Sequence, residues 1–198
     1  MKKMNIVYGV AGMIVMLLIF SQLFAMKETN KIEMYPYTVV KDYGTFEIRK
    51  YEPANFTSVT LSGKTYSETA NRGFRTLAGY IFGGNATNEK IPMTSPVTMN
   101  MGDSVTMRFL LPADKKIDSL PKPNASNIQF TTEPSKTMAA IRFGGWASDK
   151  KISTNTQKLT ELLKQNGITS IGKFSYFGYN PPFMIFNRRN EVVVEVIY

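Results

Sequence analysis

The residues that most often carry enzymatic chemistry are missing from this chain. Its 198 residues include no histidine and no cysteine. This excludes Ser-His-Asp triads, thiol nucleophiles, zinc held by His or Cys and haem iron held by His. No pair of carboxylates has a spacing that demands acid–base catalysis. Glu191 follows Arg188, Arg189 and Asn190 in an expected hairpin, where a solvated ion pair is the simplest interpretation. We predict a binding protein, with acid–base chemistry on Glu or Tyr as the catalytic alternative.

Methionine is the residue type that points to a ligand. Met99 and Met101 share one face of an expected strand, because side chains alternate along a strand, and Met93 is near them in sequence. Thioether side chains adapt to flat hydrophobic ligands, although each of them also suits gap-filling in a core. The single tryptophan, Trp146, has two similar interpretations, stacking on a ligand or packing at the end of a strand.

The charge balance favours an anionic partner. The chain carries 24 Lys and Arg against 15 Asp and Glu, a formal net charge of +9. Such an excess suits nucleic acid, anionic lipid or a small molecule with carboxylates. Lys and Arg are scattered and never occur more than two in a row, which disfavours a nucleic-acid-binding module. We therefore expect a small apolar anion as the ligand and no nucleic acid.

The N-terminal segment is apolar enough to cross a membrane. No residue from 6 to 26 is charged, and about 20 apolar residues span a hydrocarbon core of roughly 30 Å. Lys2 and Lys3 should stay cytoplasmic, which predicts a single-pass protein with an extracytoplasmic C-terminal domain. The alternative is a signal peptide cleaved after Ala25, which would leave a secreted or periplasmic domain. We predict an anchor over residues 1–26, a tether over 27–34 and a folded domain over 35–198.

The folded domain contains an internal repeat. The dipeptide Glu52-Pro53 recurs as Glu133-Pro134, and Gly63 recurs as Gly144 at the same offset. In both copies an apolar, β-branched run precedes a glycine and a helical stretch. The repeat predicts two related units of strands and one helix each.

Hydrophobic periodicity sets the expected elements. One helix is predicted over residues 67–82, where Phe74, Leu77, Ala78 and Ile81 share one face, and another over 153–165. Four hairpins are predicted by alternation and turn residues, namely 45–52 with 56–61, 97–101 with 105–111, 128–132 with 137–143, and 183–186 with 192–197. These elements predict an α+β fold, with one curved antiparallel sheet or distorted β-barrel and two helices packed against it.

Three sequence motifs resemble those of the SOUL haem-binding protein family. They are YIFGGN at 80–85 with KIPMTSPV at 90–97, GYNPP at 178–182 with RRNEV at 188–192, and YTVV at 37–40 with FEIRKY at 46–51. The resemblance covers about residues 35–198. It implies a distorted antiparallel β-barrel built from a duplicated unit and flanked by two helices. It also implies that haem or another tetrapyrrole binds in an apolar cleft beside the first helix, without a conserved histidine ligand.

The resemblance places the ligand on two segments. Carried over residue by residue, it implies contacts from Asn71, Phe74, Arg75 and Ala78 on the first helix and from Met184 after the Pro-Pro pair. Asn71 stands where members carry a basic residue, and Met184 stands where they carry a lysine.

Other basic residues would then have to hold the propionates of the ligand. Arg72, Arg75 and Lys173 are the candidates. Met184 is also a candidate iron ligand through its thioether, with Tyr176 and Tyr179 as weaker oxygen ligands. The competing interpretation is that Phe74, Ala78 and Met184 simply pack the helix onto the sheet.

Two further roles stay open at the level of sequence. The same cleft and charge would suit another apolar anion, such as a fatty acid or lipid. A structural or partner-binding role would leave no cavity beside the first helix. The sequence makes no prediction of oligomeric state or of the iron state of the ligand.

Overall fold

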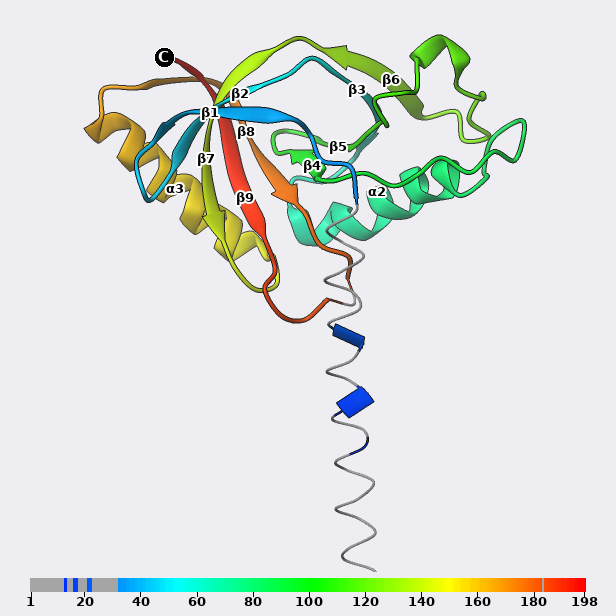
Figure 1. Cartoon of the computed structure of the whole chain (residues 1–198), viewed down its shortest axis with the longest axis horizontal. Coiled ribbons are helices and arrows are strands. Elements are labelled where there is room, and N and C mark those ends of the chain that lie inside the picture. The colour runs from blue at the N-terminus through cyan, green and yellow to red at the C-terminus, as the bar shows by residue number, and fades with distance from the viewer. Residues whose placement is uncertain (1–12, 14–15, 18–20, 23–31, 183) are drawn as a thin grey trace, which may run out of the picture.

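The computed structural model describes residues 13, 16–17, 21–22, 32–182 and 184–198. These residues form nine strands and two long helices (Figure 1). The elements are β1 (Tyr37–Asp42), β2 (Glu47–Tyr51), β3 (Ala54–Leu61), α2 (Tyr66–Ile81), β4 (Val97–Asn100), β5 (Val105–Leu110), a short 3-10 helix η1 (Ile117–Ser119), β6 (Ile128–Glu133), β7 (Lys136–Phe143), α3 (Asp149–Gln165), β8 (Thr169–Gly178) and β9 (Asn190–Ile197).

The two helices lie where the apolar spacing predicts them. The first predicted helix agrees with α2 to within one residue at each end. The second, α3, begins at Asp149 rather than at residue 153, because the Ser148 side chain accepts a hydrogen bond from the Lys151 amide and caps the helix there. The three residues that open α3, 149–151, are all charged, so hydrophobic periodicity gives no signal before Ile152.

All nine strands form one antiparallel sheet in the order β1-β2-β7-β9-β8-β4-β5-β3-β6. Leaving β1 aside, this order is symmetric about the β4–β8 pair. The unit β2-β3-α2-β4-β5 corresponds to β6-β7-α3-β8-β9, as the sequence repeat predicts. The sheet is strongly curved (Figure 1). Over the described residues its two end strands, β1 and β6, are not joined by a ladder of hydrogen bonds.

Three of the four predicted hairpins are wrong. β2 pairs with β7 and β3 pairs with β6, so the first strand of each unit joins the other unit. Two-residue hairpin turns need Gly or Asn at positive φ, and the residues that connect these strands, Glu52-Pro53 and Pro134-Ser135, include neither. β9 pairs with β8 rather than with residues 183–186, of which 184–186 form a loop. The β4–β5 hairpin is confirmed.

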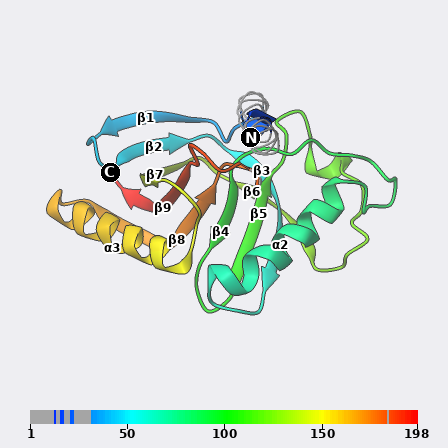
Figure 2. The same ribbon diagram turned by 90° about the horizontal axis from the view of Figure 1, so that it is seen from below.

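Each face of the sheet is covered by its own apolar cluster. On the helix-bearing face, Leu77 and Ile81 of α2 and Leu159 and Leu163 of α3 pack against the strands. Both helices cover this same face (Figure 2). The other face carries a second, aromatic-rich cluster that includes the following buried side chains: Tyr35, Tyr51, Phe56, Phe177 and Tyr179.

Of the predicted membrane segment, residues 6–26, the structure describes residues 13, 16–17 and 21–22, and the rest lies outside the described residues. Within the part of the chain that the structure describes, no helix combines the length and the apolar character needed to cross a membrane.

Candidate ligand-binding site

The N-terminus of α2 is fixed by a capping box. The Thr65 hydroxyl accepts a hydrogen bond from the Glu68 amide, and the Glu68 carboxylate accepts one from the Thr65 amide. Two hydrogen bonds from the Lys64 and Thr65 amides lower the pKa of Glu68 below its ordinary value. This arrangement sets where α2 begins and which of its faces meets the sheet.

The residues predicted on α2 divide between the core and the surface. Ala78 is buried in the main core, and half-buried Phe74 packs on Phe109 of β5 with ring centroids 5.4 Å apart. These contacts agree with the packing interpretation.

The polar residues predicted on α2 are exposed. Asn71, Arg72 and Arg75 all face solvent. The Arg72 guanidinium donates a hydrogen bond of 2.5 Å to the Ser62 carbonyl, and that of Arg75 donates one of 3.4 Å to the Asn71 carbonyl. Both arginines remain accessible to an anion.

Met184 is buried in the loop between β8 and β9. Its sulfur accepts a hydrogen bond of 3.0 Å from the Asn180 side-chain amide. Its carbonyl accepts one of 2.6 Å from the Arg188 guanidinium. These contacts lie within the loop rather than toward α2. The first of them uses one of the two lone pairs of the sulfur.

A cleft of about 460 Å³ opens between the N-terminal ends of the two helices. This volume lies in the range of small-molecule sites. Of the residues that the sequence singles out for a ligand, Lys173 and Met101 line the cleft, whereas Met99 is buried in the core. The lining residues are Lys64, Thr65, Met101, Asp149, Ile152, Ser153, Thr156, Gln157, Lys173, Phe174 and Ser175.

The cleft combines apolar walls with two exposed ammonium groups. Met101, Ile152 and Phe174 supply apolar surface, and Lys64 and Lys173 supply positive charge. Gly102 makes room for Lys173, since a Cβ atom at Gly102 would lie 2.7 Å from the Lys173 Nζ. Such a lining suits a ligand with an apolar body and an anionic end.

Asp149 is the one carboxylate in the lining, and hydrogen bonds already engage it. Its Oδ1 accepts a hydrogen bond of 2.6 Å from the Tyr66 amide, and its Oδ2 accepts one of 3.3 Å from the Ser67 amide. Asp149 opens α3, so it ties the start of α3 to the first turn of α2 across the cleft. Negative charge at a helix N-terminus also stabilises the helix dipole.

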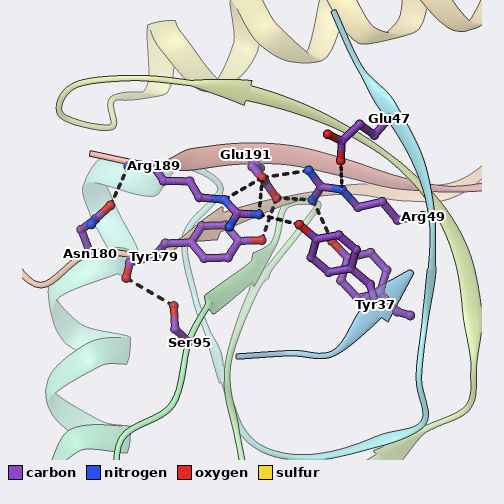
Figure 3. A network of polar contacts seen from close by, with 9 residues as sticks. Tyr37, Glu47, Arg49, Ser95, Tyr179, Asn180, Arg189 and Glu191 are labelled. Carbon is purple, nitrogen blue, oxygen red and sulfur yellow. Dashed lines mark hydrogen bonds and ion pairs between the residues drawn. The ribbon is translucent and has the colours of Figure 1, made fainter. Parts of the chain in front are cut away.

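A buried network of charged and phenolic groups lies on the opposite face of the sheet (Figure 3). The Glu191 carboxylate is fully buried and accepts hydrogen bonds of 2.8 and 3.1 Å from Arg49. It also accepts one of 2.9 Å from Arg189 and one of 2.7 Å from the Tyr179 hydroxyl. The expected solvated ion pair at Glu191 is therefore wrong. Side chains of β9 alternate between the two faces of the sheet, and Glu191 lies on the same face as Val193 of the second cluster.

Two aromatic rings and the loop ends complete this network. The Arg49 guanidinium lies 4.4 Å from the ring centre of Tyr37, and that of Arg189 lies 3.9 Å from the ring centre of Tyr179. The Asn180 side chain accepts a hydrogen bond of 2.6 Å from the Arg189 amide. The network thus holds both ends of the β8–β9 loop, as Figure 3 shows.

The network keeps its carboxylate charged and its phenol protonated. Burial alone would raise the pKa of Glu191, but hydrogen bonds from Arg49 and the charges of Arg49 and Arg189 lower it below its usual value. Burial raises the pKa of the Tyr179 hydroxyl well above its ordinary value, and the nearby Glu191 charge adds to the effect. None of the network residues lines the cleft between the helix ends.

Comparison with known proteins assigns a family. The model of the SOUL heme-binding protein family matches residues 32–195. The chain is 31% identical over 160 residues to heme-binding protein 1 of Xenopus laevis, covering 77% of this chain and 84% of that one. It is 30% identical over 158 residues to human heme-binding protein 2, covering 75% of this chain and 77% of that one.

Solved structures share the fold at low sequence identity. The C-terminal domain of EcmrR superposes with a TM-score of 0.61 at 11% identity, covering 81% of this chain and 98% of that one. A hydrolase from Listeria innocua superposes with a TM-score of 0.56 at 8% identity, covering 80% of this chain and 94% of that one. At these identities the likeness extends to the fold alone. Together with the family match over nearly the whole described domain, these findings show that the chain belongs to the SOUL heme-binding protein family.

Proposed function

We propose that this protein binds haem or a related tetrapyrrole, and that it acts as a binding protein rather than an enzyme. The observation that carries the proposal is the family match over residues 32–195, joined by relatives that are named heme-binding proteins. Fold alone would not support a function. Here the support comes from sequence similarity across the domain, together with a cleft of suitable chemistry.

The cleft between the helix ends is the site we propose for the ligand. The apolar plane would lie against Met101 and Phe174, and the propionates would reach Lys64 and Lys173. Burial of roughly 300 Å² of apolar ligand surface contributes on the order of 7 kcal/mol. Loss of rigid-body freedom reduces this figure, so we expect a micromolar dissociation constant.

The α2 surface predicted from the sequence is the competing location for the same ligand. There, Arg72 and Arg75 would hold the propionates beside Phe74. Both arginines are exposed, so neither location requires α2 to move. The two locations use different cations, and substitution can therefore separate them.

Titration of the full-length protein with haemin, followed at the Soret band, tests the function. We expect a saturable one-to-one shift beyond that given by empty detergent micelles. Met184→Leu tests iron ligation in the same titration, since loss of an iron ligand moves the band and not merely the affinity. Absence of any saturable shift in the unmodified protein would overturn haem binding.

A second candidate ligand is another apolar anion, such as a fatty acid. One observation favours it: the whole chain contains neither His nor Cys, the common protein ligands of haem iron. The two lysines of the cleft would hold a single carboxylate equally well. Displacement of a fluorescent fatty acid by unlabelled fatty acid, with no response to haemin, would favour this candidate.

A further inference from the structure

Three large apolar side chains are exposed where two neighbouring loops meet. Trp146, in the turn between β7 and α3, is 52% exposed, and Ile185 and Phe186, in the β8–β9 loop, are 50% and 63% exposed. We call these three residues the loop patch. Single exposed apolar residues are ordinary, but a group of them on adjoining loops marks an interaction surface.

Arg188 binds the two loops together. Its guanidinium lies 4.2 Å from the centre of the Trp146 ring. It also donates hydrogen bonds of 2.8 Å to the Pro181 carbonyl and 2.6 Å to the Met184 carbonyl. The buried Glu191 network holds the ends of the β8–β9 loop from beneath. The loop patch is thus held in place by the contacts of Arg188 and by the Glu191 network.

The charges around the loop patch are mostly positive. Residues 144–151 and 180–190 contain four cations, namely Lys150, Lys151, Arg188 and Arg189, and a single carboxylate, Asp149. Asp149 is engaged by the first amides of α2. Arg189 belongs to the buried network, whereas Lys150 and Lys151 face solvent. Exposed apolar and aromatic side chains flanked by lysines are the composition of surfaces that bind anionic bilayers.

The N-terminal segment approaches the same end of the domain. The Ile185 amide donates a hydrogen bond of 2.8 Å to the Gln22 side chain. The described part of the N-terminal segment lies at this end of the molecule (Figure 1). Met13, Met16 and Leu17 of that segment are 55%, 70% and 62% exposed, and residues 6–26 carry no charge. The apolar interior of a single lipid bilayer could bury the apolar side chains of both this segment and the loop patch.

We propose that the loop patch lies in the headgroup region of an anionic lipid bilayer. Trp146 and Phe186 would enter the interface, the level at which aromatic side chains concentrate in membrane proteins. Lys150 and Lys151 would face the lipid phosphates. The end of the domain that carries the loop patch would then contact the membrane. The tetrapyrrole cleft plays no part in the contact, so the proposal is independent of haem binding.

The single tryptophan gives a direct test. The full-length, haem-free protein is reconstituted in vesicles of phosphatidylcholine and phosphatidylserine that contain lipids brominated at shallow or deep positions along the chain. Trp146 is the only tryptophan, so all tryptophan emission comes from the loop patch. We expect a blue shift relative to the emission of the urea-unfolded protein. We also expect quenching that is stronger for bromines near the headgroups than for bromines at the bilayer centre.

A spin label supplies the matched control. The chain has no cysteine, so Phe186→Cys and Ile197→Cys each carry one label. Ile197 is 66% exposed at the end of β9. We expect the label at 186 to be more accessible to oxygen than to a water-soluble nickel complex, with the reverse at 197. Unquenched Trp146, equal accessibility at both positions or failure to associate with the vesicles would overturn the proposal. A blue shift that is insensitive to bromine but lost on dilution would assign the loop patch to a second copy of the chain instead.

Discussion

Glu191 is the residue on which the buried network depends. Two guanidinium groups and one phenol form hydrogen bonds with its carboxylate. Arg49 also pairs with Glu47, whose side chain is less buried than that of Glu191. Removing one partner from such a buried ion pair leaves uncompensated charge, and that penalty exceeds the net gain from the pair itself. The contribution of Glu191 lies in holding β2 and the β8–β9 loop against β9.

Glu191→Gln should therefore destabilise the protein strongly. We expect a loss of about 3–5 kcal/mol in the free energy of unfolding, because Arg189 would lose its counter-charge and buried Arg49 would keep only the partly exposed Glu47 carboxylate, 2.6 Å away. Urea unfolding followed by circular dichroism measures it. Glu195→Gln is the matched control, since Glu195 lies on the same strand and is 38% exposed; it should change the value by less than about 0.5 kcal/mol. Equal, small effects of the two substitutions would contradict this account.

The lowered pKa of Glu191 also predicts how stability depends on pH. The pKa is lower in the folded chain than the value of about 4.3 for an unfolded glutamate. The stabilisation is complete above about pH 4.3 and is lost as the pH falls through the folded-state pKa. Between about pH 5 and about pH 3, the unmodified protein should lose more unfolding free energy than Glu191→Gln. Parallel pH profiles for the two proteins would refute the assignment.

At the scale of elements, local features could be predicted and strand partners could not. The apolar spacing of Leu77, Ala78 and Ile81 lies within one helix, so α2 is visible in the sequence. The pairing of β2 with β7 joins residues 47–51 to residues 136–140. The residues around Glu52-Pro53 contain no signal that predicts so distant a partner. The cap that Asp149 provides for α2 could not be predicted either, because Asp149 and the first turn of α2 are far apart in the sequence.

Asp149→Ala tests that cap between the helices. Tyr66 and Ser67 would lose the acceptor for their amides, which should cost about 1 kcal/mol of stability. Hydrogen exchange at these two amides should speed up, while the amides of Leu159 and Leu163 in α3 keep their protection. Asp118→Ala, at an exposed carboxylate of η1, is the control and should leave all four amides unchanged. Unchanged exchange at Tyr66 in Asp149→Ala would show that Thr65 alone caps α2.

At the scale of the whole molecule, the cleft lies where the two units meet. β4 and β8 form the central ladder of the symmetric sheet, and Met101 and Ser175 bring the ends of that ladder into the cleft lining. Sequence alone predicts the repeat and the family, and it singles out Met101 and Lys173, which both line the cleft. It does not place Lys64 beside the same cleft as Lys173, because these two lysines are 109 positions apart in the chain and only the fold brings them together.

The most direct test of the central claim compares haemin with haemin dimethyl ester, whose propionates carry no charge. Both are titrated against the unmodified protein, Lys64→Gln/Lys173→Gln and Arg72→Gln/Arg75→Gln. The account predicts that the lysine variant loses roughly tenfold in affinity for haemin and little for the ester, because each exposed ion pair contributes under about 1 kcal/mol. The arginine variant should bind both ligands as the unmodified protein does. Saturable haemin binding that ignores the lysines and weakens in the arginine variant would move the site to α2. No saturable binding to any of the three proteins would contradict haem binding itself.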